Sequence, residues 1–223
     1  MKILVASDKW KGSLSAIEAC AAIRRALQRL WPGAEIIERP IADGGEGTAA
    51  ALAGACGGQW ITRTVSGPLA SPVTAGYALL PDGTAVIEMA AAAGLVLTGG
   101  TLDPWRATTR GVGELMADAA ARGARRLIIG LGGSATNDAG AGLAAALGWT
   151  FDSLPIATRV LERPSTPWAL ETLAACDVTN PLLGPSGCTR VFGPQKGVRD
   201  SDIAAFEHAL ANLASCFPPE IAE

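Results

Sequence analysis

A glycine-rich polar loop in the middle of the chain carries residue types suited to binding phosphate. Residues 132–138 read Gly-Gly-Ser-Ala-Thr-Asn-Asp, follow the apolar run 127–131 and precede the alanine-rich segment 139–148. This order predicts a buried strand, a loop and a helix. At the carboxyl end of a strand in a parallel α/β sheet, loop N–H groups and a helix N-terminus favour anionic ligands. An ordinary strand-to-helix turn is the alternative interpretation.

Three further polar loops follow strand-like runs, at residues 7–13, 42–48 and 177–180. Open α/β sheets place their binding sites in the loops at the carboxyl ends of strands. We therefore expect at least two of the four loops to converge.

The first of these loops offers two lysines and an acid just before a predicted helix. Lys9, Lys11, Asp8 and Ser13 suit the binding of a phosphoryl group or a carboxylate. A solvated loop with a capping serine is the alternative.

The second loop combines two carboxylates with glycines. Asp43 and Glu46 are candidate metal ligands, and Gly44 and Gly45 let the backbone approach a ligand closely, as Mg²⁺–phosphate sites require. A flexible turn whose acids favour the following helix dipole is the alternative.

Three more acids and one lysine could take part in binding or chemistry. Asp138 and Asp177 each suit a general base or metal ligand, although an aspartate at a strand end is often a helix cap. Lys196 lies in a glycine-flanked turn and could bind a charged ligand. A plain exposed turn is the alternative. Glu88 lies in an apolar run and needs a partner or a ligand if buried.

Composition restricts the class of partner. The 223 residues include 18 basic and 21 acidic side chains, for a net charge of −3, with no block of like charge. We expect a small-molecule partner, no nucleic acid and no membrane, and the possibility of a homo-oligomer stays open. Five scattered cysteines predict reduced, mostly buried thiols, and a cytoplasmic protein is the default expectation.

The elements that position the loops follow from hydrophobic periodicity and capping residues. Residues 1–38 predict a strand, a helix that begins with a capping box at Ser15 and Glu18, and a parallel second strand. An alanine-rich helix follows to about Cys56, and a change to short β-rich runs indicates a domain boundary near residue 60. Further strands are expected at 60–66, 73–80, 84–89 and 173–176, and further helices at 111–121 and from about Asp202.

The sequence also contains a motif that is typical of dinucleotide binding. Gly130, Gly132 and Ala135 satisfy a dinucleotide fingerprint, with Asp152 about 20 residues further on, so an NAD(P)-dependent oxidoreductase is an alternative. Asp138 beside that loop would repel a pyrophosphate unless a cation intervened. The chain has no P-loop, no kinase catalytic loop of the H-R-D type and no G-x-S-x-G elbow.

Taken in order, the motifs resemble the glycerate kinase family of the bacterial glycerate 2-kinase type. The matching blocks are Asp8 with residues 11–16, and residues 42–48, 64–69, 87–92, 130–138, 175–182 and 192–197. The resemblance implies two α/β domains with Rossmann-like parallel-sheet character. Residues 1–60 would form the N-terminal part of the first domain, and residues 61–223 would form the second.

The resemblance also implies an activity and a set of roles. It implies ATP-dependent, Mg²⁺-assisted phosphorylation of D-glycerate to 2-phosphoglycerate in a cleft between the domains. On this basis Lys11 and the amides of residues 132–134 would donate to phosphate, Asp43 or Glu46 would hold Mg²⁺, and Asp177 or Asp138 would accept the hydroxyl proton. Lys9, Arg110 or Lys196 would bind the glycerate carboxylate. The expected binding residues are Asp8, Lys9, Ser13, Gly44, Gly45, Gly132, Gly133, Ser134, Thr136, Asn137, Asn180 and Lys196.

The chain departs from the family pattern in four places. Residues 7–11 read Ser-Asp-Lys-Trp-Lys where Pro-Asp-Ser-Phe/Tyr-Lys is usual, and Ala139 replaces a usual glycine. The region between Phe151 and Leu173 is shortened, and the family continues for well over a hundred residues beyond Glu223. We therefore expect a truncated kinase with an incomplete first domain and weak or no activity. A non-catalytic remnant is a further alternative.

Overall fold

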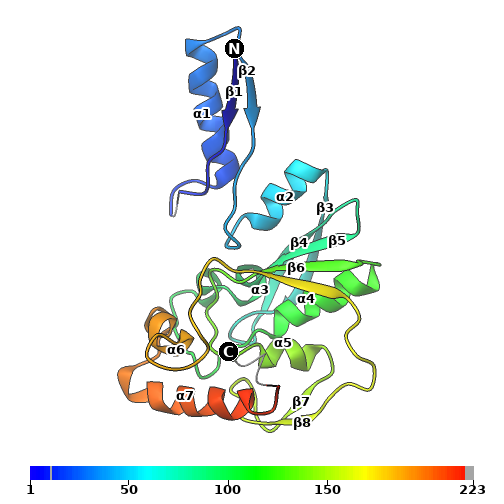
Figure 1. Cartoon of the computed structure of the whole chain (residues 1–223), viewed down its shortest axis with the longest axis vertical. Helices are drawn as coiled ribbons and strands as arrows, with labels where there is room; N and C mark the ends of the chain where they lie inside the picture. Colours follow the sequence, from blue (N-terminus) through cyan, green and yellow to red (C-terminus); the bar gives the residue numbers. More distant parts are fainter. Residues whose placement is uncertain (11, 219–223) are drawn as a thin grey trace.

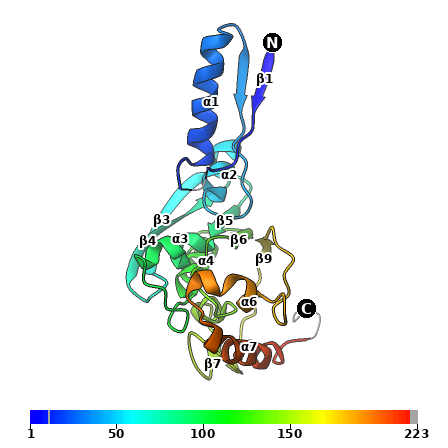
Figure 2. The same cartoon turned by 90° about the vertical axis from the view of Figure 1, so that its left-hand side faces the viewer.

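The computed structural model describes residues 1–10 and 12–218. The described strands form three sheets: β1 with β2, a five-stranded sheet in the order β3-β4-β5-β6-β9, and β7 with β8. Figures 1 and 2 show the unit of β1, α1 and β2 projecting from the body built on the five-stranded sheet. The expected mixed α/β fold is confirmed.

The projecting unit is the predicted strand-helix-strand motif. β1 (Lys2–Val5) pairs in parallel with β2 (Glu35–Glu38), and α1 (Ala16–Leu30) connects them. Ser15 accepts a hydrogen bond from the Glu18 N–H, and the Glu18 carboxylate accepts one from the Ser15 N–H, so the capping box is confirmed. Residues 39–47 connect the end of β2 to the body (Figure 1).

The five-stranded sheet is antiparallel on one side and parallel on the other. β3 (Gln59–Ser66), β4 (Pro72–Leu79) and β5 (Thr84–Glu88) are antiparallel neighbours, whereas β5, β6 (Arg126–Gly130) and β9 (Glu171–Ala175) are parallel. The loops after the three parallel strands therefore leave from one edge of the sheet.

Alternate residues of the strands face different helices. The side chains of Tyr77, Ile87 and Leu127 lie in the main core with α4 (Arg110–Ala121) and α3 (Met89–Ala93). Ala78 and Val86 face the opposite way and pack with Ala49 of α2 (Thr48–Cys56). The predicted domain boundary near residue 60 stays a prediction, and it would separate α2 from the sheet on which it packs.

The remaining elements complete the body. They are η1 (Leu95–Thr98), α5 (Ala141–Ala146), β7 (Thr150–Phe151), β8 (Val160–Glu162), α6 (Cys188–Phe192), η2 (Pro194–Lys196) and α7 (Asp200–Ala214). α7 begins two residues before its expected start and buries Phe206, Leu210 and Leu213. The expected helix over 139–148 is shorter, because Ala139 and Gly140 both have positive φ and precede the first helical residue.

Two further expectations concern cysteines and membrane spans. All five cysteines are unpaired as expected, but Cys20 alone of them is buried, so the prediction of mostly buried thiols is wrong. Within the described ranges, none of the helices has the length and apolar character needed to cross a bilayer.

Candidate active site

The carboxyl ends of the three parallel strands form one row. The register places Glu88 of β5 beside Gly130 of β6, and Gly130 beside Ala175 of β9. We call this row the carboxyl edge. The loop 131–140 and the segment after β9 both begin there, which brings two of the four predicted loops together.

The loop 42–48 lies directly on the carboxyl edge. The Gly132 N–H donates to the Gly44 carbonyl at 3.2 Å. A Cβ on Gly44, whose φ is +90°, would lie 2.5 Å from the Ala175 carbonyl oxygen, and a Cβ on Gly130 would lie 2.4 Å from the Gly44 oxygen. Such distances exclude larger residues, so these glycines permit the close backbone contact between the loops. The expected convergence is confirmed.

Glu88 anchors the loop 42–48 and the start of α2. Its Oε1 accepts a hydrogen bond of 2.7 Å from the Ala49 N–H. Burial raises the Glu88 pKa above its ordinary value, and the bond to Ala49 opposes that shift. The partner that this buried acid was expected to need is therefore the N-terminus of α2.

The loop 7–13 joins the site through an ion pair. Lys9 Nζ donates to Asp43 Oδ1 at 2.7 Å, and the Gly45 N–H donates to the same oxygen at 2.9 Å. Asp8 accepts a hydrogen bond from the Lys9 backbone N–H. Lys11 lies outside the described residues. Ser13 is exposed, and its N–H donates to the Trp10 carbonyl.

Lys196 approaches the loop 132–138 from η2. Its Nζ donates to Ser134 Oγ at 3.0 Å and to the Thr136 carbonyl at 2.6 Å. Burial lowers the Lys196 pKa, because the charged ammonium has left bulk water. The structure thus brings Lys196, Ser134 and Thr136 together, although 60 residues of sequence separate the lysine from the threonine.

The end of the same loop is held by buried hydrogen bonds. Asp138 is 2% exposed. Its Oδ2 accepts from the Thr109 N–H, the Thr109 hydroxyl and the Gly142 N–H, while its Oδ1 accepts from the Gly140 N–H. Burial raises the Asp138 pKa, and these donors oppose the shift. Its carboxylate is occupied in joining the loop to α4 and α5.

Asn137 is held in a similar way by a residue that sequence reasoning missed. Its Nδ2 donates to the buried hydroxyl of Thr189 in α6 at 3.0 Å. Thr109, bonded to Asp138, was missed as well. A threonine pair before the helix 110–121 was visible in the sequence, but nothing near it in the chain indicates Asp138 as its partner.

Asp177 differs from Asp138 in its surroundings. It is exposed and lies two residues after Ala175, next to the loop contacts at Gly44. Asn180 is exposed too, and its Nδ2 donates to the Ser186 carbonyl. Glu46 is exposed, and a Cβ on Gly133 would lie 3.7 Å from its Oε1. Arg110, a candidate for carboxylate binding, pairs instead with Glu114 at 3.2 Å.

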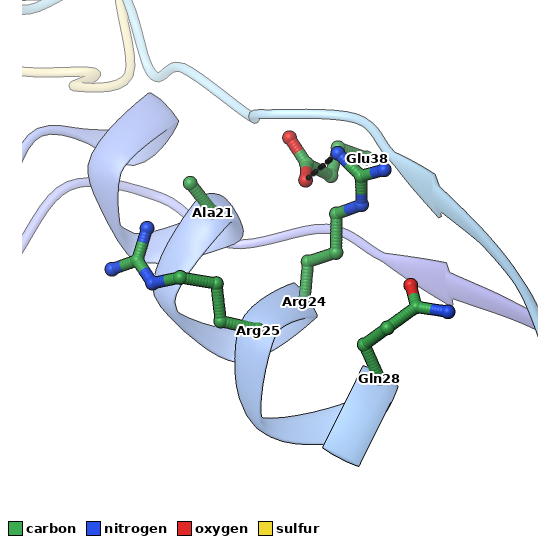
Figure 3. A pocket seen from close by; sticks show the side chains of 5 residues that line it. All are labelled: Ala21, Arg24, Arg25, Gln28 and Glu38. Atoms are coloured by element: carbon green, nitrogen blue, oxygen red, sulfur yellow. Dashed lines mark hydrogen bonds and ion pairs between the residues drawn. The ribbon is translucent and has the colours of Figure 1, made fainter. Parts of the chain in front are cut away.

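One surface hollow lies on the projecting unit, away from the four loops. It is lined by Ala21, Arg24, Arg25, Gln28 and Glu38 of α1 and β2 (Figure 3). Arg24 points toward Glu38, and their side chains form an ion pair of 3.4 Å. This hollow contains none of the predicted site residues.

The dinucleotide alternative gains no support from the position of Asp152. This residue follows β7, which pairs with β8 in a sheet separate from β6. The Thr158 hydroxyl donates to its carboxylate, as do the N–H groups of Thr158, Arg159 and Ser153, and these bonds lower its pKa to about 2. In dinucleotide-binding folds, the acid that binds the ribose hydroxyl follows a strand in the same sheet as the strand before the glycine loop.

Comparisons with known proteins agree with the loop motifs. The sequence model of the "Glycerate kinase family" matches residues 3–222. The chain is 44% identical to "Glycerate kinase" of Bacillus subtilis and 41% identical to "Glycerate 2-kinase" of Escherichia coli, in each case over 96% of this chain and 60% of the relative. The crystal structure of "putative glycerate kinase 2" from Salmonella typhimurium superposes with a TM-score of 0.84 at 41% identity, covering 97% of this chain and 62% of that one. The chain thus spans about 60% of the length of the curated relatives it matches, and it belongs to the glycerate kinase family.

Proposed function

We propose that this chain carries the substrate and nucleotide loops of an ATP-dependent kinase that converts D-glycerate to 2-phosphoglycerate. The observation that carries the proposal is the meeting of two glycine-rich loops, 42–48 and 131–138, at the carboxyl edge in a chain of this family. Relatives named glycerate kinase and glycerate 2-kinase support the substrate and the position of transfer.

The proposed roles follow from what each side chain is free to do. The amides of Gly132, Gly133 and Ser134 would donate to phosphate oxygens, and Lys196 beside Ser134 would supply positive charge. Asp177 is exposed at the carboxyl edge, so it is the better candidate to accept the glycerate hydroxyl proton. Asp138 would hold the loop in place.

Magnesium would have few protein ligands at this site. Among the described residues, no group of three His, Cys, Asp or Glu side chains is placed to hold a metal ion. Kinases usually hold Mg²⁺ with one or two carboxylates and the substrate phosphates, and Asp43 and Glu46 match that smaller set. When bound with ATP, the ion would neutralise phosphate charge.

Binding separates the kinase proposal from the oxidoreductase alternative. The melting temperature is measured in parallel with ATP–Mg²⁺ and with NADPH or NADH. ATP–Mg²⁺ is expected to raise it, and the nicotinamides are expected to leave it unchanged. Stabilisation by the nicotinamide alone would overturn the kinase proposal.

Turnover tests the substrate and the base. ADP release that depends on D-glycerate, with a 2-phosphorylated product seen by ³¹P NMR, is expected to exceed that of an Asp177→Asn variant. Equal ADP release by the two proteins would contradict the assignment of Asp177.

A further inference from the structure

Lys9 is surrounded by carboxylates from two loops. Its Nζ lies 2.7 Å from Asp43 Oδ1 and 3.9 Å from Asp8 Oδ1. The charge of Glu46 also acts on the Lys9 ammonium. The Lys9 side chain is only 24% exposed. One ammonium therefore offsets part of the negative charge of three acids.

The Lys9–Asp43 pair is also supported by the backbone. The Asp43 oxygen that accepts from Lys9 accepts from the Gly45 N–H as well. Although partial burial disfavours the ammonium, the bond to Asp43 leaves the Lys9 pKa raised, and the Lys9 bond lowers the Asp43 pKa. Both groups are charged at neutral pH, so the pair persists over the whole physiological range.

The Asp43 carboxylate would also attract a divalent cation. Mg²⁺ and Mn²⁺ bind carboxylate oxygens, and a cation at Asp43 would stand beside the Lys9 ammonium at the distance where like charges repel strongly. The carboxylate has lone pairs enough for both, so the two cations compete through their charges and not for a single oxygen.

We propose that the Lys9 ammonium is the resident cation of the Asp43 carboxylate, and that a divalent ion binding there must compete with its charge. In this arrangement Lys9 is a positioning residue: it joins the loops 7–13 and 42–48 when no metal is present. The inference rests on the proposed function only in the choice of Asp43 as a metal ligand.

Mn²⁺ titration of the full chain, followed by the electron paramagnetic resonance signal of the free ion, tests this without ATP or glycerate. Lys9→Gln, which keeps much of the side-chain length and removes the charge, is expected to bind Mn²⁺ at least about ten-fold more tightly than the unaltered chain. Adding Asp43→Asn to that variant is expected to abolish the gain.

Lys2→Gln is the matched control, because Lys2 also pairs with an acid, Glu35, at 3.3 Å, but at the start of β1. It should leave Mn²⁺ affinity unchanged. Equal Mn²⁺ affinity in Lys9→Gln and the unaltered chain would overturn the proposal, as would an equal gain in Lys2→Gln.

Thermal unfolding provides a second readout that does not depend on the strength of the metal signal. In EDTA, Lys9→Gln is expected to melt at a lower temperature than the unaltered chain, and Mn²⁺ should raise its melting temperature more. A Mn²⁺ shift that is the same for both proteins would refute the competition between the two cations. Because substrates are absent, failure of the kinase proposal would not produce this result.

Discussion

Ala139 adopts a backbone conformation that glycine adopts more easily. Its φ is +47°, in the left-handed region where a Cβ is unfavourable. The preceding residue is Asp138, whose hydrogen bonds to Gly140 and Gly142 fix this turn. We therefore predict that Ala139→Gly raises the free energy of unfolding by about 0.5–1 kcal/mol, measured by urea denaturation.

The same substitution elsewhere should have the opposite sign. Ala117 is exposed in the middle of α4, where glycine loses more conformational freedom than alanine on folding. Ala117→Gly is expected to lower the free energy of unfolding by about 1 kcal/mol. A loss of stability in both variants would show that the left-handed turn at residue 139 carries no strain.

The two candidate bases, Asp138 and Asp177, should separate into one effect on stability and one on turnover. Asp138→Asn replaces an acceptor oxygen with a donor NH₂ in a buried site filled by donors, so we predict a loss of about 2–3 kcal/mol. Asp177→Asn affects an exposed side chain and should change stability by less than about 0.5 kcal/mol.

Turnover then completes that comparison. If Asp177 accepts the hydroxyl proton, Asp177→Asn is expected to lower glycerate-dependent ADP release by about 100-fold or more without unfolding the chain. A stable Asp177→Asn variant with full turnover, or an Asp138→Asn variant as stable as the unaltered chain, would reverse the two assignments.

At the scale of elements, Glu88 couples the end of β5 to the start of α2. Its bond to the Ala49 N–H is buried and involves a charged acceptor. We predict that Glu88→Ala lowers the free energy of unfolding by about 2 kcal/mol in urea titration. Glu171→Ala is the control, because Glu171 pairs with Arg126 while 56% of its side chain is exposed, and exposed pairs contribute less than about 1 kcal/mol. Equal losses of unfolding free energy in the two variants would contradict a stabilising role for the Glu88–Ala49 hydrogen bond.

Local patterns predicted most elements, because their signals lie within a few residues of each other. The capping box at Ser15 and Glu18, the strands on either side of residues 81–83 and the glycine loop after β6 are examples. The start of α5 was missed, because an alanine in the left-handed conformation carries no glycine signal. β7 and β8 are too short for periodicity to indicate them.

Site contacts were harder to predict than site loops. Residue types and the position of loops after strands indicated which segments converge. The bonds that assign roles join residues far apart in the chain, such as Lys9 with Asp43 and Asn137 with Thr189. Only the folded geometry shows that Asp138 is enclosed and Asp177 exposed.

At the scale of the molecule, the β1–β2 sheet and the five-stranded sheet differ in how well they are enclosed. In the described part of the chain, β1 and β2 pair only with each other, and Leu4 of β1 is 63% exposed. β5 has a partner strand on each side, and all five of its residues are buried. Figures 1 and 2 show the β1–α1–β2 unit standing apart from the body that contains β5.

We therefore predict that the β1–α1–β2 unit opens far more often than the five-stranded sheet. A two-stranded sheet is marginally stable by itself, and local opening depends on how many buried contacts hold an element. After correction for intrinsic exchange rates, hydrogen exchange of β2 amides is expected to be at least about 100-fold faster than that of β5 amides, a difference of about 2.7 kcal/mol in opening free energy. β6, which also has a strand on each side, is the internal control and should match β5. Equal protection of β2 and β5 would contradict this prediction. It would mean that the Lys9–Asp43 ion pair and the segment 39–47 hold the two parts together as one cooperative unit.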